Sequence, residues 1–278
     1  MATPGPDAAR QRAGGTEGAA ATATGLAPLV SVVVPTYREA ANIPLLVPRV
    51  SSALREAGLE HEIVIVDDNS RDGSEEAVAE LSRNLPVRIL VRRHERGLAT
   101  AVLYGLREAR GRVLVSMDAD LSHPPEAVPR LARAIIDGAD FAMGSRYIPG
   151  ASIDEAWTMF RWLNSKVALM MAKPLTPASD SGAGFFAISR AVLDAADPLD
   201  PVGYKVALEL LVKAPIREMV EVPIHFADRK HGQSKLSLKQ QVLYLRHLAR
   251  LAKYRLGKRG KKRPRLVRLG TGPGCNSG

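Results

Sequence analysis

Residues 112–126 read RVLVSMDADLSHPPE, and this stretch decides the fold prediction. Residues 113–117 form a mainly apolar run of strand length that ends at two carboxylates, Asp118 and Asp120. Because side chains alternate across a strand, these two acids leave its end on the same side. Paired carboxylates suit Mg²⁺ or Mn²⁺, which take oxygen ligands and keep substrate phosphates as further partners. The stretch therefore favours a metal–diphosphate site, with a helix cap ahead of Pro124 as the simpler alternative.

Strand and helix patterns alternate around this stretch. Strands are expected at residues 29–34, 62–66, 87–91, 112–117 and 140–143, and helices at 42–54, 74–83, 97–109 and 126–137, with Asn42 as a helix cap. This alternation predicts an α/β fold of βαβ units on a mostly parallel sheet flanked by helices. Ligands of such sheets bind at the carboxyl ends of the strands. Acids follow three of the expected strands: Glu39, Asp67 with Asp68, and Asp118 with Asp120.

The formal charge of +10 is unevenly distributed along the 278 residues. From residue 229 onward there are 15 Lys and Arg and no acids, so the preceding part carries 24 minus 29, or −5. We expect a disordered lead at 1–27, one globular domain at 28–235, a basic amphipathic helix at 236–257 and a disordered basic tail at 258–278. Such a basic end favours an anionic surface as partner. Nucleic acid is disfavoured because Tyr244 and Tyr254 are the only aromatic residues there.

Cysteine content and hydropathy indicate the compartment and the relation to membranes that we expect for this protein. Cys275 is the single cysteine, so an intramolecular disulfide is excluded and a reducing compartment is expected. No apolar run approaches the roughly 18 residues that a membrane-spanning helix needs, and residues 1–27 lack the apolar core of a signal peptide. No glycine-rich phosphate loop follows the first strand, which argues against a P-loop and a dinucleotide fingerprint.

Residues 237–256 have the pattern of a basic amphipathic helix. Apolar side chains share one face and cations lie beside it: Leu238, Val242, Leu245, Leu248, Ala249, Ala252 and Leu256, with Lys239, Arg246, Arg250 and Lys253. Such a helix can lie in an anionic membrane interface. The same face could equally dock onto the globular domain, so the pattern leaves both interpretations open.

Six segments, taken together and in order, resemble glycosyltransferase family 2. They are PTYREAANIP (35–44), IVIVDDNSRDGS (63–74), RGLATAVLYGL (96–106), MDADLSHPPE (117–126), GSRYIPG (144–150) and FADRKHGQSKLS (226–237). The resemblance covers about residues 29–250 and is nearest to dolichyl- or polyprenyl-phosphate mannosyltransferases. It implies a glycosyltransferase A fold and inverting transfer of mannose from GDP-mannose to a polyprenyl phosphate with Mg²⁺ or Mn²⁺. It also implies a peripheral enzyme at the cytoplasmic face of an anionic membrane, compatible with a membrane-protein partner.

The same resemblance implies roles for individual residues. The donor nucleotide would be bound by Pro35, Tyr37, Glu39, Val66, Asp68, Asp118, Ala119, Asp120, Arg146, Arg229 and Lys235. Asp118, Asp120 and Arg146 would be catalytic, and Asp118, Asp120 and Ser122 would hold the metal, although many family members have Gln at the last position. Arg146, Arg161 and Ser165 would bind the acceptor phosphate. Asp180 matches a family acid near the acceptor and receives no role.

Other functions stay open at this stage. A UDP-glucose or UDP-GlcNAc transferase acting on a lipid phosphate or a glycan fits the same motifs, and a non-catalytic protein binding nucleic acid or membrane is the remote alternative. A lipid monophosphate is already an anion near neutral pH, so it needs arginines more than a general base. His94, His225 and His231 are accordingly interpreted as structural or solvated residues.

Overall fold

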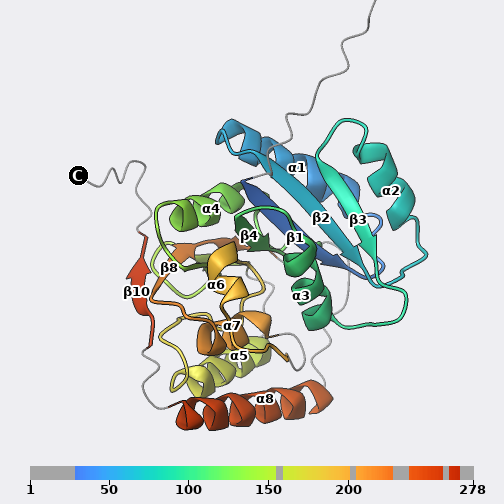
Figure 1. Cartoon of the computed structure of the whole chain (residues 1–278). Coiled ribbons are helices and arrows are strands. Elements are labelled where there is room, and N and C mark those ends of the chain that lie inside the picture. The colour runs from blue at the N-terminus through green and yellow to red at the C-terminus, as the bar shows by residue number, and fades with distance from the viewer. Residues whose placement is uncertain (1–28, 155–158, 201–204, 228–237, 259–262, 270–278) are drawn as a thin grey trace, which may run out of the picture.

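The computed structural model describes residues 29–154, 159–200, 205–227, 238–258 and 263–269. Its centre is an eight-stranded sheet with the order β10-β8-β5-β7-β4-β1-β2-β3 (Figure 1). The strands are β1 (Val30–Thr36), β2 (His61–Asp67), β3 (Val87–Val91), β4 (Val113–Ser116), β5 (Phe141–Ser145), β7 (Phe186–Ser189), β8 (Glu218–Pro223) and β10 (Arg265–Arg268). Neighbouring strands are parallel, except that β7 is antiparallel to both β4 and β5. The expected mostly parallel sheet is confirmed.

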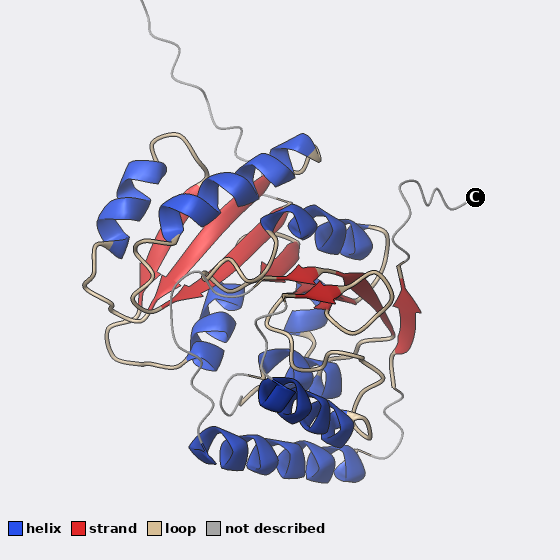
Figure 2. Ribbon diagram, turned by 180° about the vertical axis from the view of Figure 1, so that it is seen from behind, coloured by secondary structure: helices blue, strands red, loops and turns tan. Residues whose placement is uncertain are grey.

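Helices cover both faces of this sheet (Figure 2). They are α1 (Ile43–Glu56), α2 (Ser74–Leu81), α3 (Leu98–Glu108), the 3₁₀ turn η1 (Pro125–Ala127), α4 (Val128–Ile136), α5 (Met159–Ala172), α6 (Arg190–Asp194), α7 (Val206–Lys213) and α8 (Leu238–Gly257). Two short strands, β6 (Ser152–Ile153) and β9 (His225–Phe226), form a separate parallel pair. Each expected helix up to residue 137 is present, with ends within about two residues of the prediction.

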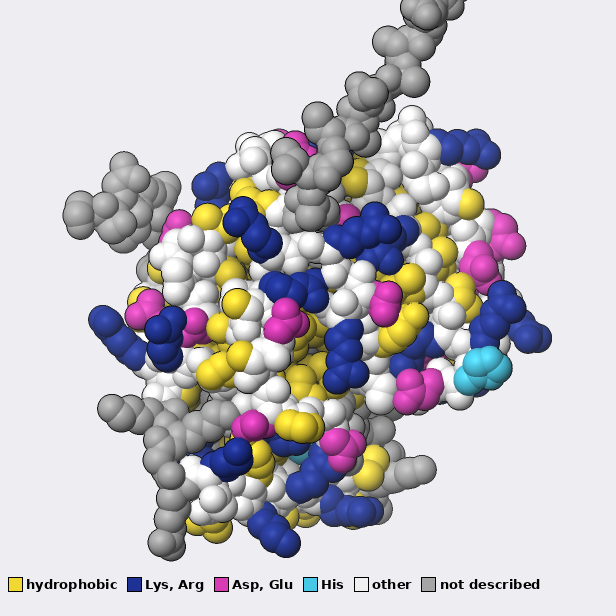
Figure 3. Space-filling view, viewed as in Figure 1, with side chains coloured by type: hydrophobic (Ala, Val, Ile, Leu, Met, Phe, Trp, Pro, Cys, Tyr) yellow, Lys and Arg dark blue, Asp and Glu magenta, His cyan; other side chains and the backbone are white. Residues whose placement is uncertain are grey.

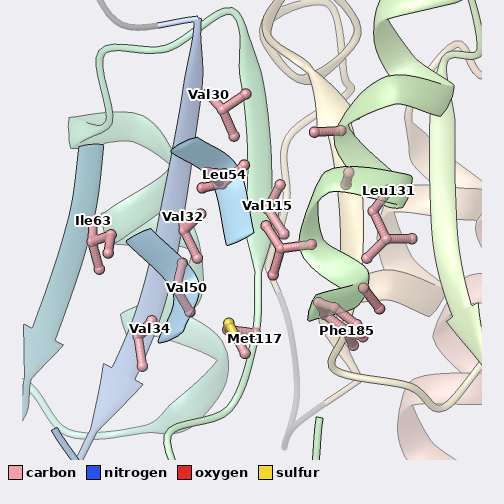
Figure 4. Close-up of a cluster of buried hydrophobic side chains, with 14 of the residues drawn as sticks. Val30, Val32, Val34, Val50, Leu54, Ile63, Val115, Met117, Leu131 and Phe185 are labelled. Carbon is pink, nitrogen blue, oxygen red and sulfur yellow. The ribbon is translucent and has the colours of Figure 1, made fainter. Parts of the chain in front are cut away.

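The alternation of side chains along β1 divides the core into two clusters. Val30, Val32 and Val34 pack on one face with residues of α1 and α4, including Leu54 and Leu131 (Figure 4). On the other face, the cluster joins Val33 of β1 with residues of β2, α3 and α7. Because the strand is buried on both sides, most of its residues are apolar, and its buried polar residues Ser31 and Thr36 are hydrogen-bonded. The end of the buried run marks the end of the strand, and the residues after it lie at the carboxyl edge of the sheet.

Helix α3 lies unusually close to the sheet. A Cβ atom at Gly105 would come within 2.4 Å of Val33 Cγ1 and 2.6 Å of Val66 Cγ2. Contacts this short do not occur between real side chains, so only glycine permits the helix to approach β1 and β2 this closely. Burial of Val33 and Val66 against the helix backbone therefore depends on the absence of a side chain at residue 105.

Strand β7 brings a distant segment to the carboxyl ends of the parallel strands. Phe186, the first residue of β7, pairs with Ser116 at the end of β4 and with Met143 of β5. Because β7 runs in the opposite direction, the residues just before it enter the sheet where its neighbours leave it. Residues 179–185 therefore lie at the same edge as the acids after β4. The sequence did not predict this reversal.

Helix α8 lies within two residues of the expected amphipathic helix at 236–257. Its apolar side chains divide between two environments. Leu248 and Leu251 are buried in a cluster with Leu208 and Val212 of α7. Other apolar side chains are exposed: Val242 at 56%, Leu245 at 47% and Leu256 at 74%. The helix thus docks onto the domain and still presents apolar surface to solvent.

Two details differ from the sequence prediction. Residues 258–278 were expected to be disordered, but Arg265–Arg268 form the edge strand β10, in which Leu266 and Val267 pack against the core clusters. The run is too short to give a strand signal, and it pairs because β8 would otherwise be an open edge. Asn42 precedes α1 but makes no capping hydrogen bond; its Nδ2 donates instead to Glu39 Oε2 at 2.6 Å.

No helix among the residues that the structure describes is both long and apolar enough to cross a bilayer.

A buried ion pair joins α7 to its surroundings. Glu209 is 1% exposed, and its Oε1 accepts hydrogen bonds from Lys213 Nζ at 2.6 Å and from the backbone N–H of Asp200 at 2.9 Å. Nε2 of His247 in α8 lies 3.4 Å from Oε2. Burial alone would raise the pKa of Glu209, but the contacts with His247 and Lys213 lower it to about 2.

We expect Glu209→Gln to lower the free energy of unfolding by about 3 kcal/mol at pH 7. The lowered pKa means that the charged carboxylate stabilises the fold fully above about pH 4.5 and loses this effect as the pH falls toward about 2. The difference between variant and parent should therefore shrink between pH 5 and pH 2 in urea unfolding. Glu108→Gln, at an exposed position of α3, should change little. A pH-independent difference would contradict this account.

Candidate active site

The loops at the carboxyl ends of the strands have unusual backbone conformations. Among the described residues, four other than glycine have positive φ: Arg38 after β1, Asn69 and Arg71 after β2, and Leu121 after β4. Left-handed conformations cost energy for residues with a side chain and tend to occur at functional sites. Within the described ranges, every such residue lies at this one edge of the sheet, the edge to which the sequence assigned its acids.

The two acids after β4 have different environments. Asp118 has a side chain that is 32% exposed, and a Cβ atom at Gly184 would come within 3.2 Å of its Oδ1. Asp120 is buried, and its Oδ1 accepts hydrogen bonds from the backbone N–H of Ser122 at 3.1 Å and from Ser122 Oγ at 2.6 Å. Ser122 therefore orients Asp120, while glycine at 184 leaves room in front of Asp118.

His123 holds the backbone of this loop in place, a role that was not predicted from the sequence. Its Nδ1 accepts the backbone N–H of Asp118 at 3.1 Å. The ring stacks on Phe185 with a centroid distance of 5.0 Å and meets Phe226 edge-on at 5.5 Å. Burial lowers the pKa of His123 and outweighs the opposing charges of Asp118 and Asp120. The ring is therefore a neutral acceptor that fixes the backbone of the acidic pair.

Arg146, directly after β5, is held by Asp180. The guanidinium donates from Nε to Oδ2 at 2.7 Å and from Nη2 to Oδ1 at 2.8 Å, and the Arg146 backbone N–H reaches Oδ2 at 3.2 Å. Burial would lower the pKa of Arg146, but the charge and hydrogen bonds of Asp180 raise it overall. The guanidinium also lies 5.0 Å from the centroid of the Phe226 ring, which contacts His123. Arg146 is thus a permanently charged group beside the acidic loop.

Lys205 is a second cation that the sequence analysis did not identify. Its Nζ donates to the carbonyl of Gly182 at 3.2 Å, in the segment that carries Asp180. Burial and the nearby charge of Arg146 lower the pKa of Lys205 to about 8, although Asp180 opposes the shift. The ammonium lies 5.8 Å from the ring centroid of Tyr244 in α8. No local pattern marks this lysine, because its neighbours come from distant segments.

The expected nucleotide-binding residues Pro35, Tyr37, Val66 and Asp68 lie at the carboxyl ends of β1 and β2 or directly after them. Pro35 and Val66 are register partners on adjacent strands. Tyr37 is 37% exposed, with the Arg96 guanidinium 5.2 Å from its ring centroid. Asp68 accepts hydrogen bonds from Arg92 Nε at 2.7 Å and from the backbone N–H of Gly97 at 2.8 Å.

The structure places some of the other residues predicted for the site, and the rest lie outside the described residues or have side chains that are not described. Ala119 is buried between the two acids. The carbonyl of Glu39 accepts the backbone N–H groups of Asn42 and Ile43 at the start of α1. Arg161 and Ser165 belong to α5, but their side chains are not among the described atoms, and Arg229, Lys235 and His231 lie outside the described residues.

The donor set fits a cation that substrate phosphates help to bind. Among the described residues there is no group of three or more His, Cys, Asp or Glu side chains able to hold a metal ion alone. Asp118 and Asp120 supply carboxylate oxygens, and the missing Cβ at residue 184 keeps the space before Asp118 open. Two carboxylates with phosphate and water as further ligands are typical of Mg²⁺ sites. A preformed structural metal site would need more protein ligands.

Comparison with known proteins shows the family of the chain. Residues 31–196, more than half of the chain, match the family model described as Glycosyl transferase family 2. The chain is 45% identical over 248 residues to a dolichol-phosphate mannosyltransferase of Mycosarcoma maydis, covering 86% of this chain and 84% of that protein. It is 46% identical over 236 residues to the protein of the same name from Saccharomyces cerevisiae, covering 82% and 88%.

The fold has counterparts among solved structures. Glucosyl-3-phosphoglycerate synthase from Mycobacterium tuberculosis, solved with Mn²⁺, UDP and glucosyl-3-phosphoglycerate, superposes with a TM-score of 0.59 at 19% identity, covering 83% of this chain and 80% of that one. At this identity the likeness concerns the fold, and it confirms the expected glycosyltransferase A architecture. Together with the family match and the two relatives, it shows that the chain is a glycosyltransferase belonging to glycosyl transferase family 2.

Proposed function

We propose that this glycosyltransferase moves mannose from GDP-mannose to a polyprenyl phosphate of the dolichyl type, with inversion, in the presence of Mg²⁺ or Mn²⁺. The observation that carries the proposal is the placement of the Asp118 carboxylate close enough to the guanidinium of Arg146 to act on its charge, with the buried Asp120 two residues further along the same loop. Acids and a fixed cation side by side suit a diphosphate donor together with a phosphate acceptor. The names of the two relatives refer to mannosyl transfer and to dolichol phosphate, which supports the sugar and the lipid of this proposal.

The environment of Asp180 favours a phosphate acceptor over a sugar hydroxyl. A hydroxyl acceptor needs a general base within hydrogen-bonding reach of its proton. Both carboxylate oxygens of Asp180 already accept hydrogen bonds from Arg146, and Nδ1 of His123 accepts the Asp118 amide. A phosphate monoester carries negative charge near neutral pH and can attack without losing a proton. It needs cations for binding, and Arg146 is one.

Transfer requires that charge developing on the departing nucleoside diphosphate be stabilised. A divalent cation held by Asp118 and Asp120 would supply this as a Lewis acid. Arg146 contributes a charge that is already oriented, because its bidentate bond to Asp180 limits its rotation. His123 and Ser122 keep the two acids in place through the Asp118 backbone and the Asp120 carboxylate. The expected closing loop with Arg229 and Lys235 remains part of this proposal.

The lipid phosphate is proposed to lie between Arg146 and α5. We expect Arg161→Ala to raise the KM for polyprenyl phosphate by about 10- to 100-fold, the value of a lost charged hydrogen bond. The KM for the nucleotide sugar should stay within about twofold, since only the acceptor would meet this arginine. Steady-state kinetics with each substrate varied in turn measure both. Lys173→Ala, an exposed cation just after α5, is the matched control. An equal rise in both KM values would contradict the placement.

Peripheral attachment at the cytoplasmic face of an anionic membrane is part of this proposal, and the surface of α5 and α8 supports contact with a bilayer. The two helices lie side by side (Figures 1 and 2), joined by a hydrogen bond from Tyr244 Oη to the Ala168 carbonyl at 2.7 Å. Exposed apolar side chains occur on both: Val167, Met170, Met171, Val242 and Leu245. Such side chains can enter the interfacial region of a bilayer. Co-sedimentation with anionic and with neutral vesicles tests this, and no binding to either would contradict it.

One assay tests the substrates. The full chain is incubated with polyprenyl phosphate, Mg²⁺ or Mn²⁺, and GDP-mannose, UDP-glucose or UDP-GlcNAc in turn, and products are identified by mass. Mannosyl polyprenyl phosphate from GDP-mannose alone is the expected result; products only from UDP-sugars would favour the alternative donor.

Nucleic-acid binding is disfavoured on the face shown in Figure 3, where the described Lys and Arg side chains are scattered among acidic ones.

A further inference from the structure

Strand β10 reaches the candidate active site through side-chain contacts. Arg268 is the register partner of Glu221 in β8, and its Nε lies 3.6 Å from Glu221 Oε2. Its Nη2 donates to Ser179 Oγ at 3.2 Å. Arg268 therefore contacts both the neighbouring strand β8 and the segment that enters β7.

Glu221 links these two contacts from inside the protein. The residue is fully buried, and its Oε1 accepts the backbone N–H of Ser179 at 2.6 Å. A buried carboxylate is costly unless a positive charge and hydrogen bonds compensate it. The Arg268 side chain is 54% exposed and supplies that charge from the surface. Arg268 and Glu221 together hold Ser179 by its backbone and by its hydroxyl.

Ser179 immediately precedes Asp180, the residue that orients Arg146. Asp180 is fully buried and makes three hydrogen bonds to Arg146, so its carboxylate has little freedom to adjust. A shift of Ser179 would therefore move the Asp180 carboxylate, and with it the guanidinium. Misplacement of a catalytic group by about 1 Å can cost about a hundredfold in rate.

We propose that Arg268 and Glu221 are positioning residues for the transfer reaction, acting through Ser179 and Asp180 on Arg146. The inference rests on the proposed function of Arg146 at the substrate phosphates. It assigns to β10 a part in catalysis beyond closing the edge of the sheet. Because Arg268 touches no reacting atom in this account, it should affect the rate of transfer more than the binding of the nucleotide.

Substitution of Arg268 tests the proposal in the full chain. Arg268→Ala should lower kcat for mannosyl transfer by about 10- to 100-fold, with the KM for GDP-mannose changed by less than about threefold. Arg268→Lys keeps a charge opposite Glu221 and should restore part of the rate. Arg265→Ala is the matched control: it removes the same charge from the same strand at a side chain that is 80% exposed and 3.8 Å from Glu218. It should retain the parent kcat.

Hydrogen exchange separates positioning from a general loss of stability. Arg268→Ala should speed the exchange of backbone amides in residues 176–184 several-fold and leave residues 61–67 of β2 unchanged. Equal kcat and equal exchange in the Arg268→Ala and Arg265→Ala proteins would overturn the proposal, as would a fall in kcat with unchanged exchange in residues 176–184. If the parent transfers no sugar from any donor, the proposed function fails, while the exchange comparison still decides whether Arg268 holds this segment.

Discussion

Asp118→Asn should lower kcat for sugar transfer by about a thousandfold, the largest effect on activity expected for a single substitution in this chain. The amide keeps the shape of the side chain and the backbone hydrogen bond to His123, so the loop should stay folded. It removes the negative charge that a divalent cation requires. Initial rates measured over a series of Mg²⁺ and Mn²⁺ concentrations, with circular dichroism as a check on folding, give the result.

The control for this substitution is an acid away from the candidate site. Asp137 lies exposed at the end of α4, and Asp137→Asn makes the same chemical change away from the site. Its kcat should equal that of the parent. Parent-level turnover by Asp118→Asn, or parent turnover that EDTA leaves undiminished, would contradict the assignment of the acidic pair to a metal.

Asp180→Ala should lower the free energy of unfolding by about 3–5 kcal/mol, the usual cost of stranding one member of a buried ion pair. It removes three hydrogen bonds and leaves Arg146, whose side chain is 12% exposed, without its carboxylate. Activity should fall as well, because the guanidinium loses its fixed orientation. Urea unfolding and kcat measured on the same preparations test both effects.

A double substitution separates the two consequences. Arg146→Met in the Asp180→Ala background removes the stranded charge while keeping much of the side-chain volume, so it should recover part of the lost stability. It should recover no activity, since the cation is then absent. A double variant that is less stable than Asp180→Ala alone would show that the ion pair is not what makes that substitution costly.

Local sequence patterns predicted the acids that lie at the ends of the strands. Asp68, Asp118 and Asp120 directly follow or closely follow strands whose limits could be read from runs of apolar residues, and the strand expected at 87–91 coincides with β3. Parallel strands end at a common edge, so the acids had to meet there. The resemblance to a family added the role of Arg146, which no periodicity indicates.

The remaining features depend on contacts between distant segments. The run Phe186–Ser189 is compatible with either strand direction, and only its pairing with β4 and β5 makes β7 antiparallel. That reversal places Asp180 against Arg146, 34 residues away. Lys205 reaches the site from the residue just before α7. Strand β10, from a stretch rich in cations, pairs with β8. Neighbour relations in a sheet leave no trace in hydropathy, so these contacts could not be predicted.

Helix α5 also has a practical property. The chain contains two tryptophans, Trp157 and Trp162, and the second lies in α5 directly after Arg161. Indole emission therefore originates from one short stretch of the polypeptide, next to the arginine assigned to the lipid phosphate. A fluorescence titration of the unlabelled protein can follow events at this helix separately from those at the ends of β1 and β2.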